Sequence, residues 1–210
     1  MDIPGYVVPE SGDREKIIEV AEALGRAKRP IILAGHGALI AKAADSVRQL
    51  AERINAPVTT TLLGKGAFPE SHELSLGMLG MHGTAYANKA VVECDLIMSI
   101  GSRFDDRIIG QADKFCRDAV VIHIDIDSGE RGKMIRPDYF IQGDTRLIVD
   151  ELVKHVSRLD TDVWIKKAQA FWLHTQIPIS SDVKEWNDQV CGQLKQVGFC
   201  DFHAIRCHQL

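Results

Sequence analysis

A short, glycine-bounded segment of this 210-residue chain carries side chains suited to binding an anionic ligand. It reads Gly-Ser-Arg-Phe-Asp-Asp-Arg over residues 101–107 and follows the apolar run 96–100. Arginine binds phosphate through a bidentate fork, and carboxylates accept hydrogen bonds from hydroxyl groups. If the run is a parallel strand, the segment lies at its carboxyl end, where ligands of open α/β sheets bind. The pattern therefore predicts a site for an anionic, hydroxyl-rich ligand. A salt-bridge ladder on a solvated loop is the alternative reading of these charges.

Two further glycine-punctuated segments have the composition of ligand-binding loops. Residues 76–83 read Leu-Gly-Met-Leu-Gly-Met-His-Gly, and His82 there could either face a ligand or cap a helix beginning at Thr84. Residues 35–37 read Gly-His-Gly after an apolar run, a place where a pyrophosphate can rest on a helix N-terminus. Ile40 replaces the third glycine of the G-x-G-x-x-G pattern, so a tight strand-to-helix turn is an equal alternative.

The positions of the acidic residues argue against a nicotinamide-dependent dehydrogenase. Such enzymes carry an Asp or Glu at the end of the second strand, whereas residues 59–63 read Thr-Thr-Thr-Leu-Leu. Acids come later, as Asp125, Asp127 and Asp144, each after a predicted strand. They could meet ribose hydroxyls or an adenine amino group, or they could cap the following helices. We favour a ligand role for Asp125 and leave both roles open for Asp144.

The elements that would position these residues alternate along the chain. Hydrophobic patterning predicts strands at 30–34, 56–61, 95–100, 119–125 and 139–142, and helices at 13–29, 41–54, 84–93 and 145–159, with a long loop at 64–80. This order predicts an α/β fold, a Rossmann-like doubly wound parallel sheet of about five to six strands with helices on both faces. C-terminal helices are expected at 161–175 and 182–197. We divide the chain into a linker (1–12), a central nucleotide-binding domain (13–159) and a helical extension (160–210).

Composition narrows the class of protein. A net charge of −4 gives no reason to expect nucleic acid or an anionic membrane as a partner, and no apolar run is long enough to span a bilayer. The N-terminus lacks a secretory signal pattern, so a cytoplasmic location is expected. The five cysteines include no C-x-x-C pair. The Cys and His residues between 191 and 208 do not have the spacing of structural zinc ligands, so we predict no metal site.

Several uncommon strings occur in an order that resembles the FAD-binding central domain of acetolactate synthase, a thiamine-diphosphate enzyme. They are Thr-Thr-Thr-Leu at 59–62, Leu-Gly-Met-His-Gly at 79–83, the segment 101–107, and Gly-Asp at 143–144. The resemblance covers residues 13–157. His36 departs from the family, which usually has a small residue there.

The resemblance implies that FAD lies extended along the carboxyl edge of the sheet. The implied contacts are Gly35, His36 and Gly37 at the phosphate and ribityl region; Thr61, Leu62, Leu63, Leu79, Gly80, Met81 and His82 beside the isoalloxazine; Gly101, Ser102, Arg103, Asp105, Arg107 and Ile108 along the ribityl and pyrophosphate; and Asp125, Ile126 and Asp144 at the adenosine. Met81, Asp106 and Arg107 would face the substrate channel of the intact enzyme.

The family's reaction is non-redox and belongs to branched-chain amino acid biosynthesis. Thiamine diphosphate and Mg²⁺ support the condensation of two 2-keto acids with loss of CO2, while FAD is mainly structural. The activating glutamate and the Gly-Asp-Gly motif of this chemistry belong to other domains, and no Gly-Asp-Gly occurs in this sequence. We therefore expect no catalytic residue here, an inactive isolated chain, and the remaining synthase domains or subunits as partners. The alternative is a non-catalytic module of the same fold that binds ADP or coenzyme A, or that serves in assembly.

Overall fold

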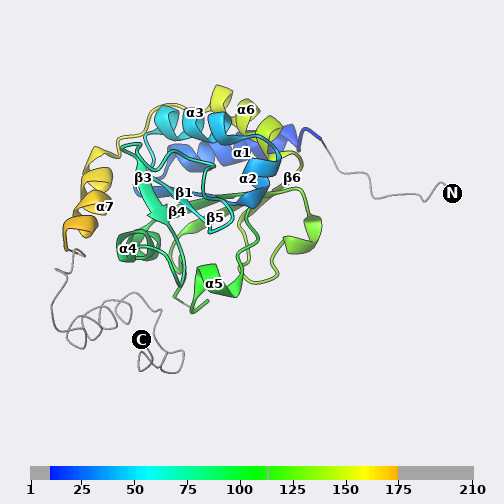
Figure 1. The fold of residues 1–210 in the computed structure, drawn as a ribbon. Helices are drawn as coiled ribbons and strands as arrows, with labels where there is room; N and C mark the ends of the chain where they lie inside the picture. The colour runs from blue at the N-terminus through cyan, green and yellow to red at the C-terminus, as the bar shows by residue number, and fades with distance from the viewer. Residues whose placement is uncertain (1–9, 113, 175–210) are drawn as a thin grey trace.

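The computed structural model describes residues 10–112 and 114–174, with side chains to residue 170. Its centre is a six-stranded parallel sheet in the order β3-β2-β1-β4-β5-β6 (Figure 1). The strands are β1 (Pro30–Ala34), β2 (Val58–Thr60), β3 (Ser75–Met78), β4 (Leu96–Ile100), β5 (Val120–Asp125) and β6 (Tyr139–Gln142). The chain builds outward from β1 to β3 and then returns to place β4 beside β1. The predicted doubly wound α/β fold is confirmed, and its topological switch point lies between β1 and β4.

Helices cover both faces of the sheet. They are α1 (Arg14–Gly25), α2 (His36–Ile40), α3 (Ala44–Ile54), α4 (Ala85–Glu93), α5 (Asp106–Ile109), α6 (Thr145–His155) and α7 (Asp162–His174), with a 3₁₀ turn, η1, at Ser128–Glu130. One layer contains α1, α3 and α6, and on the other side of the sheet α7 packs on α4 (Figure 1). None of the helices described is long and apolar enough to cross a membrane.

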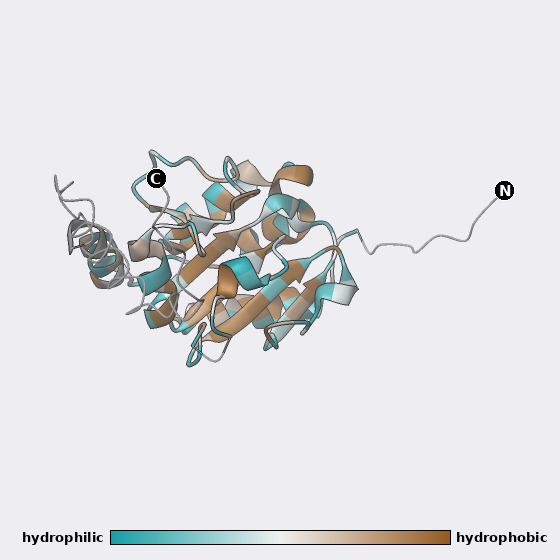
Figure 2. Cartoon of the chain, turned by 60° about the horizontal axis from the view of Figure 1, so that its bottom comes forward, coloured by the Kyte–Doolittle hydropathy of each residue, from teal (hydrophilic) through white to brown (hydrophobic). Residues whose placement is uncertain are grey.

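Sequence patterning explains why the central elements form. All residues of β1 and β4 are buried because the two strands are covered on both faces, and apolar residues dominate the interior (Figure 2). In α3 one face buries Val47, Leu50, Ala51 and Ile54 against the sheet. Hydroxyl and carboxylate caps then fix where other helices begin: the side chain of Asp13 caps α1 and that of Thr84 caps α4.

Three short elements were not predicted. The expected loop 64–80 contains β3, which is half-buried, includes Gly77 at a positive φ, and pairs with β2 in an irregular register, so its pattern is weak. The one-turn helices α2 and α5 are too short to give a periodic signal. The helix predicted from residue 41 begins at Ala44 because Lys42 has a left-handed backbone. The helix expected at 182–197, the 191–208 cluster and most of the linker at 1–12 lie outside the described residues.

The edge of the sheet at the amino ends of β1 and β4, here called the amino edge, has its polar groups paired. The two carboxylate oxygens of Asp95 accept hydrogen bonds from the backbone N–H groups of Lys28 (2.9 Å) and Arg29 (2.8 Å). The indole Nε1 of Trp164, in α7, donates to the carbonyl of Pro30 at 3.0 Å. These contacts tie the α1–β1 turn to β4 and bring the first turn of α7 onto the sheet.

Two thiols are buried beneath α4. The Sγ atoms of Cys94 and Cys116 lie 4.0 Å apart, and both approach the carbonyl of Val91. Burial raises the pKa of Cys116 well above its usual value. Cys94, which lies between α4 and β4, is also buried and packs as a small apolar residue.

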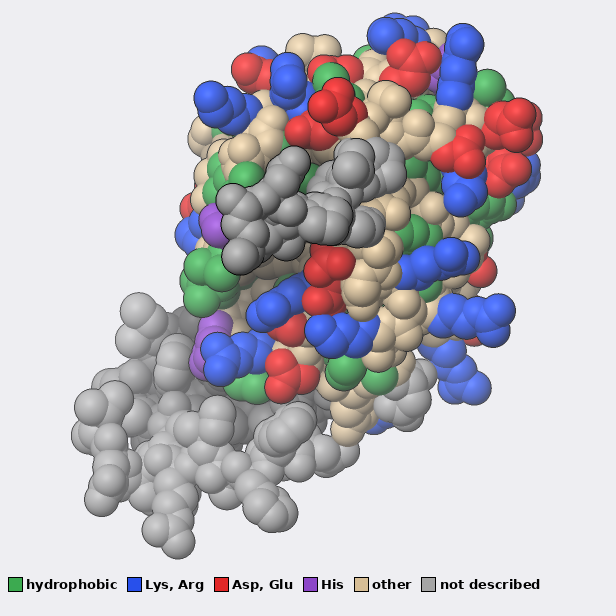
Figure 3. Space-filling view, turned by 90° about the vertical axis from the view of Figure 1, so that its right-hand side faces the viewer, with side chains coloured by type: hydrophobic (Ala, Val, Ile, Leu, Met, Phe, Trp, Pro, Cys, Tyr) green, Lys and Arg blue, Asp and Glu red, His purple; other side chains and the backbone are tan. Residues whose placement is uncertain are grey.

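One face of the molecule carries charges of both signs. On the face shown in Figure 3, Lys and Arg side chains occur together with Asp and Glu side chains.

Candidate functional site

A pocket of about 660 Å³ opens at the carboxyl edge of the sheet. The segments that follow β1, β2, β3, β4 and β5 all contribute to it, so it lies across the switch point where open α/β sheets bind ligands. Its lining residues are His36, Gly37, Thr61, Leu62, Leu63, Met78, Leu79, Met81, His82, Gly101, Ser102, Arg103, Asp105, Arg107, Ile108, Asp125, Asp127 and Glu130.

Most of the residues expected at a ligand from the sequence lie around this one cavity. The exceptions are Gly35, Gly80, Ile126 and Asp144, which do not line it. Conversely, Met78 and Glu130 line the pocket without having been singled out from the sequence. Met78 ends β3, the strand that patterning missed, and Glu130 lies in η1, for which the Asp127-Ser128-Gly129 turn was the available signal.

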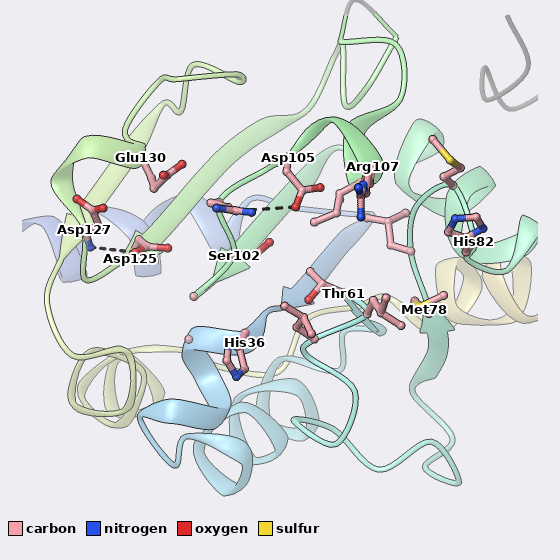
Figure 4. A pocket seen from close by; sticks show the side chains of 18 residues that line it. His36, Thr61, Met78, His82, Ser102, Asp105, Arg107, Asp125, Asp127 and Glu130 are labelled. Carbon is pink, nitrogen blue, oxygen red and sulfur yellow. Dashed lines mark hydrogen bonds and ion pairs between the residues drawn. The ribbon is translucent and has the colours of Figure 1, made fainter. Parts of the chain in front are cut away.

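The pocket has chemically different ends. Asp125, Asp127 and Glu130 lie at one end and Met78 and His82 at the other (Figure 4). Ser102, Asp105 and Arg107 lie between them, and His36 and Thr61 line the opposite wall (Figure 4). The arrangement is elongated and changes from acidic, through mixed charge, to sulfur-containing and imidazole side chains.

The acidic end is built around Asp125, the last residue of β5. Its Oδ1 accepts a hydrogen bond from the backbone N–H of Asp127 at 2.9 Å. Asp127 in turn caps η1 through the N–H of Gly129 at 2.8 Å, and Glu130 pairs with Lys133 at 3.0 Å. Asp127 is thus a cap, one of the two roles its position suggested, while Oδ2 of the buried Asp125 lies 3.6 Å from Nε2 of His123.

Two polar atoms in the middle of the pocket are buried without a protein partner. They are Oγ of Ser102 and Oδ1 of Asp105. Asp105 stands at the N-cap position of α5 but makes no capping hydrogen bond. Buried polar groups nearly always have partners, so these atoms indicate groups that a bound polar molecule would complete.

The arginines of this segment do not form the salt-bridge ladder that was the alternative reading. Nε of the largely exposed Arg103 lies 3.8 Å from Oδ2 of Asp105, a long and solvent-screened pair. No ion pair involves the Arg107 guanidinium within the part of the chain that the structure describes. Both cations therefore remain available to an anion.

The Gly-His-Gly segment has a packing explanation. A Cβ at Gly35 would lie 2.2 Å from the carbonyl oxygen of Gly101, and a Cβ at Gly101, whose φ is +61°, would lie 2.6 Å from the N of Ala38. The N–H of Gly37 donates to the carbonyl of Gly101 at 2.9 Å, so it is already used. The glycines let two loops touch, and α2 spans only five residues. The geometry therefore favours a tight strand-to-helix turn over a phosphate-binding loop. We call the backbone contact of Gly35 and Gly37 with Gly101 the glycine clasp.

The loop after β3 is held rigidly at the other end. The side-chain amide of Asn88 accepts from the N–H of Gly80 at 3.1 Å and donates to its carbonyl at 3.0 Å. The N–H of Met81 donates to the carbonyl of Arg107 at 2.8 Å. This hydrogen bond joins the loop to residues 101–107, here called the arginine segment. Gly80 thus fixes the loop that forms the pocket wall through its backbone hydrogen bonds, without lining the pocket itself.

Two further residues for which a cap and a ligand contact were both open, His82 and Asp144, resolve differently. His82 is exposed on the pocket wall, and α4 is capped by Thr84 instead, whose Oγ1 accepts from the N–H of Ala87 at 3.3 Å. Asp144 caps α6 through the N–H groups of Arg146 and Leu147, at 2.9 and 3.1 Å. Its capping role is therefore visible, and it lies outside the pocket lining. Among the described residues, no group of three or more His, Cys, Asp or Glu could hold a metal ion.

Comparison with known proteins gives one consistent family. The family described as thiamine pyrophosphate enzyme, central domain, matches residues 17–152. A probable acetolactate synthase large subunit of Methanocaldococcus jannaschii is 44% identical over 170 residues, which are 80% of this chain and 29% of that protein. The acetolactate synthase large subunit of Parasynechococcus marenigrum is 48% identical over 150 residues, 71% of this chain and 24% of the relative. The acetolactate synthase large subunit of Cyanidium caldarium is 45% identical over 159 residues, which are 76% of this chain and 27% of that protein. The matched region is thus about a quarter of each relative's length.

Proposed function

This chain belongs to the thiamine pyrophosphate enzyme family as a central domain, and from that premise we propose that its carboxyl-edge pocket binds FAD. FAD would serve as a structural cofactor in this domain, as the resemblance of the motifs to acetolactate synthases implies.

The order of chemical groups along the pocket supports this ligand. Carboxylates at the Asp125 end suit the hydroxyls of the adenosine ribose, which donate hydrogen bonds. Arg103 and Arg107 suit the diphosphate, and Leu62 and Leu63, which are 62% and 67% exposed at the pocket wall, suit an aromatic ring system.

The observation that carries the proposal is the pair of unpartnered atoms in the middle of the pocket. A hydroxyl donor at Ser102 fits a phosphate oxygen, and a carboxylate acceptor at Asp105 fits a ribityl hydroxyl. A single ligand with phosphate and polyol groups next to each other would complete both.

A titration of the chain with FAD, followed by flavin fluorescence, tests the proposal. We expect saturable binding that ADP weakens and NAD does not. Arg107→Ala should weaken FAD binding about tenfold through loss of a charge-assisted contact. Arg146→Ala is the matched control, because Arg146 is exposed on α6 away from the pocket, and it should bind as the parent does. A folded chain that binds no FAD would refute the proposal.

The ADP or coenzyme A module remains the second candidate, because the acidic and arginine regions would serve those ligands equally. It leaves the apolar end of the pocket unused. FMN separates the two, since it contains the ring system, the ribityl chain and one phosphate but no adenosine. Competition by FMN favours the FAD site, while competition by ADP alone favours the module.

For the whole protein we propose the reaction named by its relatives, formation of acetolactate, from two 2-keto acids with loss of CO2. Thiamine diphosphate and Mg²⁺ would be held by parts of the relatives that the matched region does not cover, and those domains or subunits would be partners of this one. The 210 residues by themselves should form no acetolactate from pyruvate when FAD, thiamine diphosphate and Mg²⁺ are supplied. A colorimetric acetolactate assay tests this, and product formation would overturn it.

A further inference from the structure

A histidine inside the sheet has no role in the site described so far. His123 lies in the middle of β5 and is fully buried, and neither ring nitrogen has a hydrogen-bond partner. Its ring packs edge-on against Phe104, with centroids 5.1 Å apart, and against Phe140, at 5.3 Å. An apolar aromatic residue would fill this space without leaving unpaired polar atoms, so packing alone does not account for a histidine.

A carboxylate lies close to the imidazole: that of Asp125, two residues further along the same strand. Nε2 of His123 lies 3.6 Å from Oδ2 of Asp125, and the two side chains share a face of the sheet because strand side chains alternate. The other carboxylate oxygen, Oδ1, already accepts the N–H of Asp127. A shift of a few tenths of an ångström would turn the 3.6 Å approach into a hydrogen bond.

We propose that His123 is a positioning residue for the adenosine end of the pocket. Its Nε2–H holds Oδ2 of Asp125 while the backbone of Asp127 holds Oδ1, so the carboxylate keeps one orientation toward the ribose hydroxyls of the ligand. This inference rests on the proposed nucleotide-binding function and adds a residue that does not line the pocket.

A second contact joins His123 to the arginine segment. Phe104, whose ring touches the imidazole, lies between Arg103 and Asp105 and has a positive φ of 51° that the surrounding packing must maintain. The imidazole is therefore in contact with the phosphate-facing loop on one side and with the ribose-facing carboxylate on the other. Fixing both together suits a ligand whose diphosphate and ribose are adjacent.

Two substitutions separate the effect of the hydrogen-bond donor of His123 from the effect of its aromatic ring. His123→Phe keeps an aromatic ring between Phe104 and Phe140 but removes the donor. His123→Gln loses the ring but can place its amide N–H near the position of Nε2. The full 210-residue chain and both variants would be titrated with ADP, 2′-deoxy-ADP and FMN.

His123→Phe should weaken ADP binding about tenfold, the effect of losing one hydrogen bond to a charged group. It should also reduce the preference for ADP over 2′-deoxy-ADP, while FMN affinity stays within about twofold. His123→Gln should restore most of the ADP affinity and the preference for the ribose 2′-hydroxyl. A role in packing alone would not produce this dependence on the ligand.

Several results would overturn the inference. One is a His123→Phe variant that binds ADP and discriminates against 2′-deoxy-ADP as the parent does. Another is an equal loss of ADP and FMN affinity. Failure of the proposed FAD site looks different, because the unsubstituted chain would then not bind FMN. If the unsubstituted chain binds no ADP either, the inference falls with the proposed function.

A ligand-free measurement keeps the inference testable if His123→Phe does not fold. In ¹⁵N-labelled parent chain, the Nε2 proton should give a slowly exchanging signal that is absent from His123→Gln. That signal should move when Asp125→Ala removes the acceptor. If the chemical shift of this signal is the same in the parent chain and in Asp125→Ala, the proposed contact is contradicted.

Discussion

The two edges of the sheet differ in how their buried polar groups are paired. At the amino edge, Asp95 receives two backbone N–H groups and the Trp164 indole reaches the carbonyl of Pro30. The buried polar side-chain atoms that lack partners belong, among the described residues, to Thr60, Ser102, Asp105, His123 and Thr145. Thr60 ends β2, His123 lies two positions before the end of β5, and the others follow β4 and β6.

This difference separates residues that stabilise the fold from residues kept for a ligand. A polar group paired within the protein contributes to the free energy of folding, whereas an unpaired buried one opposes folding, and a bound ligand that pairs with it removes that cost. Substitutions at the amino edge should therefore change stability without changing affinity, and those at unpaired atoms of the carboxyl edge should do the reverse. The glycine clasp, which supports the site by backbone packing, should change both.

The largest effect is expected at the glycine clasp. Gly101→Ala places a Cβ 2.6 Å from the N of Ala38 on a left-handed backbone, so unfolding in urea should show a loss of about 3 kcal/mol. Gly25→Ala is the matched control at the amino edge, because nothing lies within 4 Å of the position that its Cβ would take, and helix propensity favours alanine by about 0.5 kcal/mol. Equal behaviour of the two variants would contradict the clasp.

The second effect tests the amino edge. Asp95→Ala leaves the N–H groups of Lys28 and Arg29 without their acceptors and should cost about 2 kcal/mol of unfolding free energy. FAD affinity of the folded fraction should not change. Asp118→Ala, at an exposed carboxylate, serves as the control and should be close to neutral. A change in FAD affinity on Asp95→Ala would mean that the edges are not independent.

A matched pair of serines, one inside β4 and one just after it, sharpens the comparison at the end of a single strand. Ser99→Ala removes a buried hydroxyl that donates to the carbonyl of Ser102 at 3.0 Å and should cost about 1 kcal/mol. Ser102→Ala removes a buried hydroxyl with no partner, so stability should stay level or rise by about 0.5 kcal/mol while FAD affinity falls. Urea unfolding and flavin titration of both variants check this, and a less stable Ser102→Ala variant would argue that the hydroxyl already has a partner.

The smallest effect is expected on a helix surface away from both edges. Hydrogen bonds from Lys154 and His155 lower the pKa of Glu151 below its usual 4.5. A group with a lowered pKa in the folded state stabilises at neutral pH, and that contribution disappears as the pH falls through the folded-state pKa. Glu151→Gln should therefore be slightly less stable than the parent at about pH 7 and equal to it in strong acid. Urea titrations at several pH values test this, and a gap that widened toward acid would reverse the sign.

The sequence predicts the sheet well because its central strands have a strong physical signature. Residues 30–34 are a continuous apolar run and residues 96–100 are apolar apart from Ser99, as expected for strands covered on both faces. The edge strand β3 has no such run, since it is half-buried and interrupted by Gly77, and one-turn helices such as α2 have no period to detect.

The sequence could predict those parts of the candidate site that directly follow a recognisable strand. The segment 101–107 could be placed at the carboxyl edge because its strand was recognised, and Asp125 for the same reason. Contacts between loops were not predictable, since nothing in Gly35 or Gly101 alone reveals that their backbones touch. Asp144 shows the same limit in reverse, because a cap and a ligand contact share one sequence pattern and only the hydrogen bonds to Arg146 and Leu147 reveal the cap.

The buried thiols beneath α4 give the domain a kinetic reporter of its own. Because Cys116 is buried and its pKa is raised, a thiol reagent reacts with it only after the packing around it opens, and the labelling rate then measures how often that opening happens. Peptide-resolved mass spectrometry separates this cysteine from the others. Since α5 begins within the segment 101–107 and ends at Gly110, a ligand in the pocket should slow the labelling of Cys116. The slower rate would report that the pocket is occupied without any optical signal from the ligand.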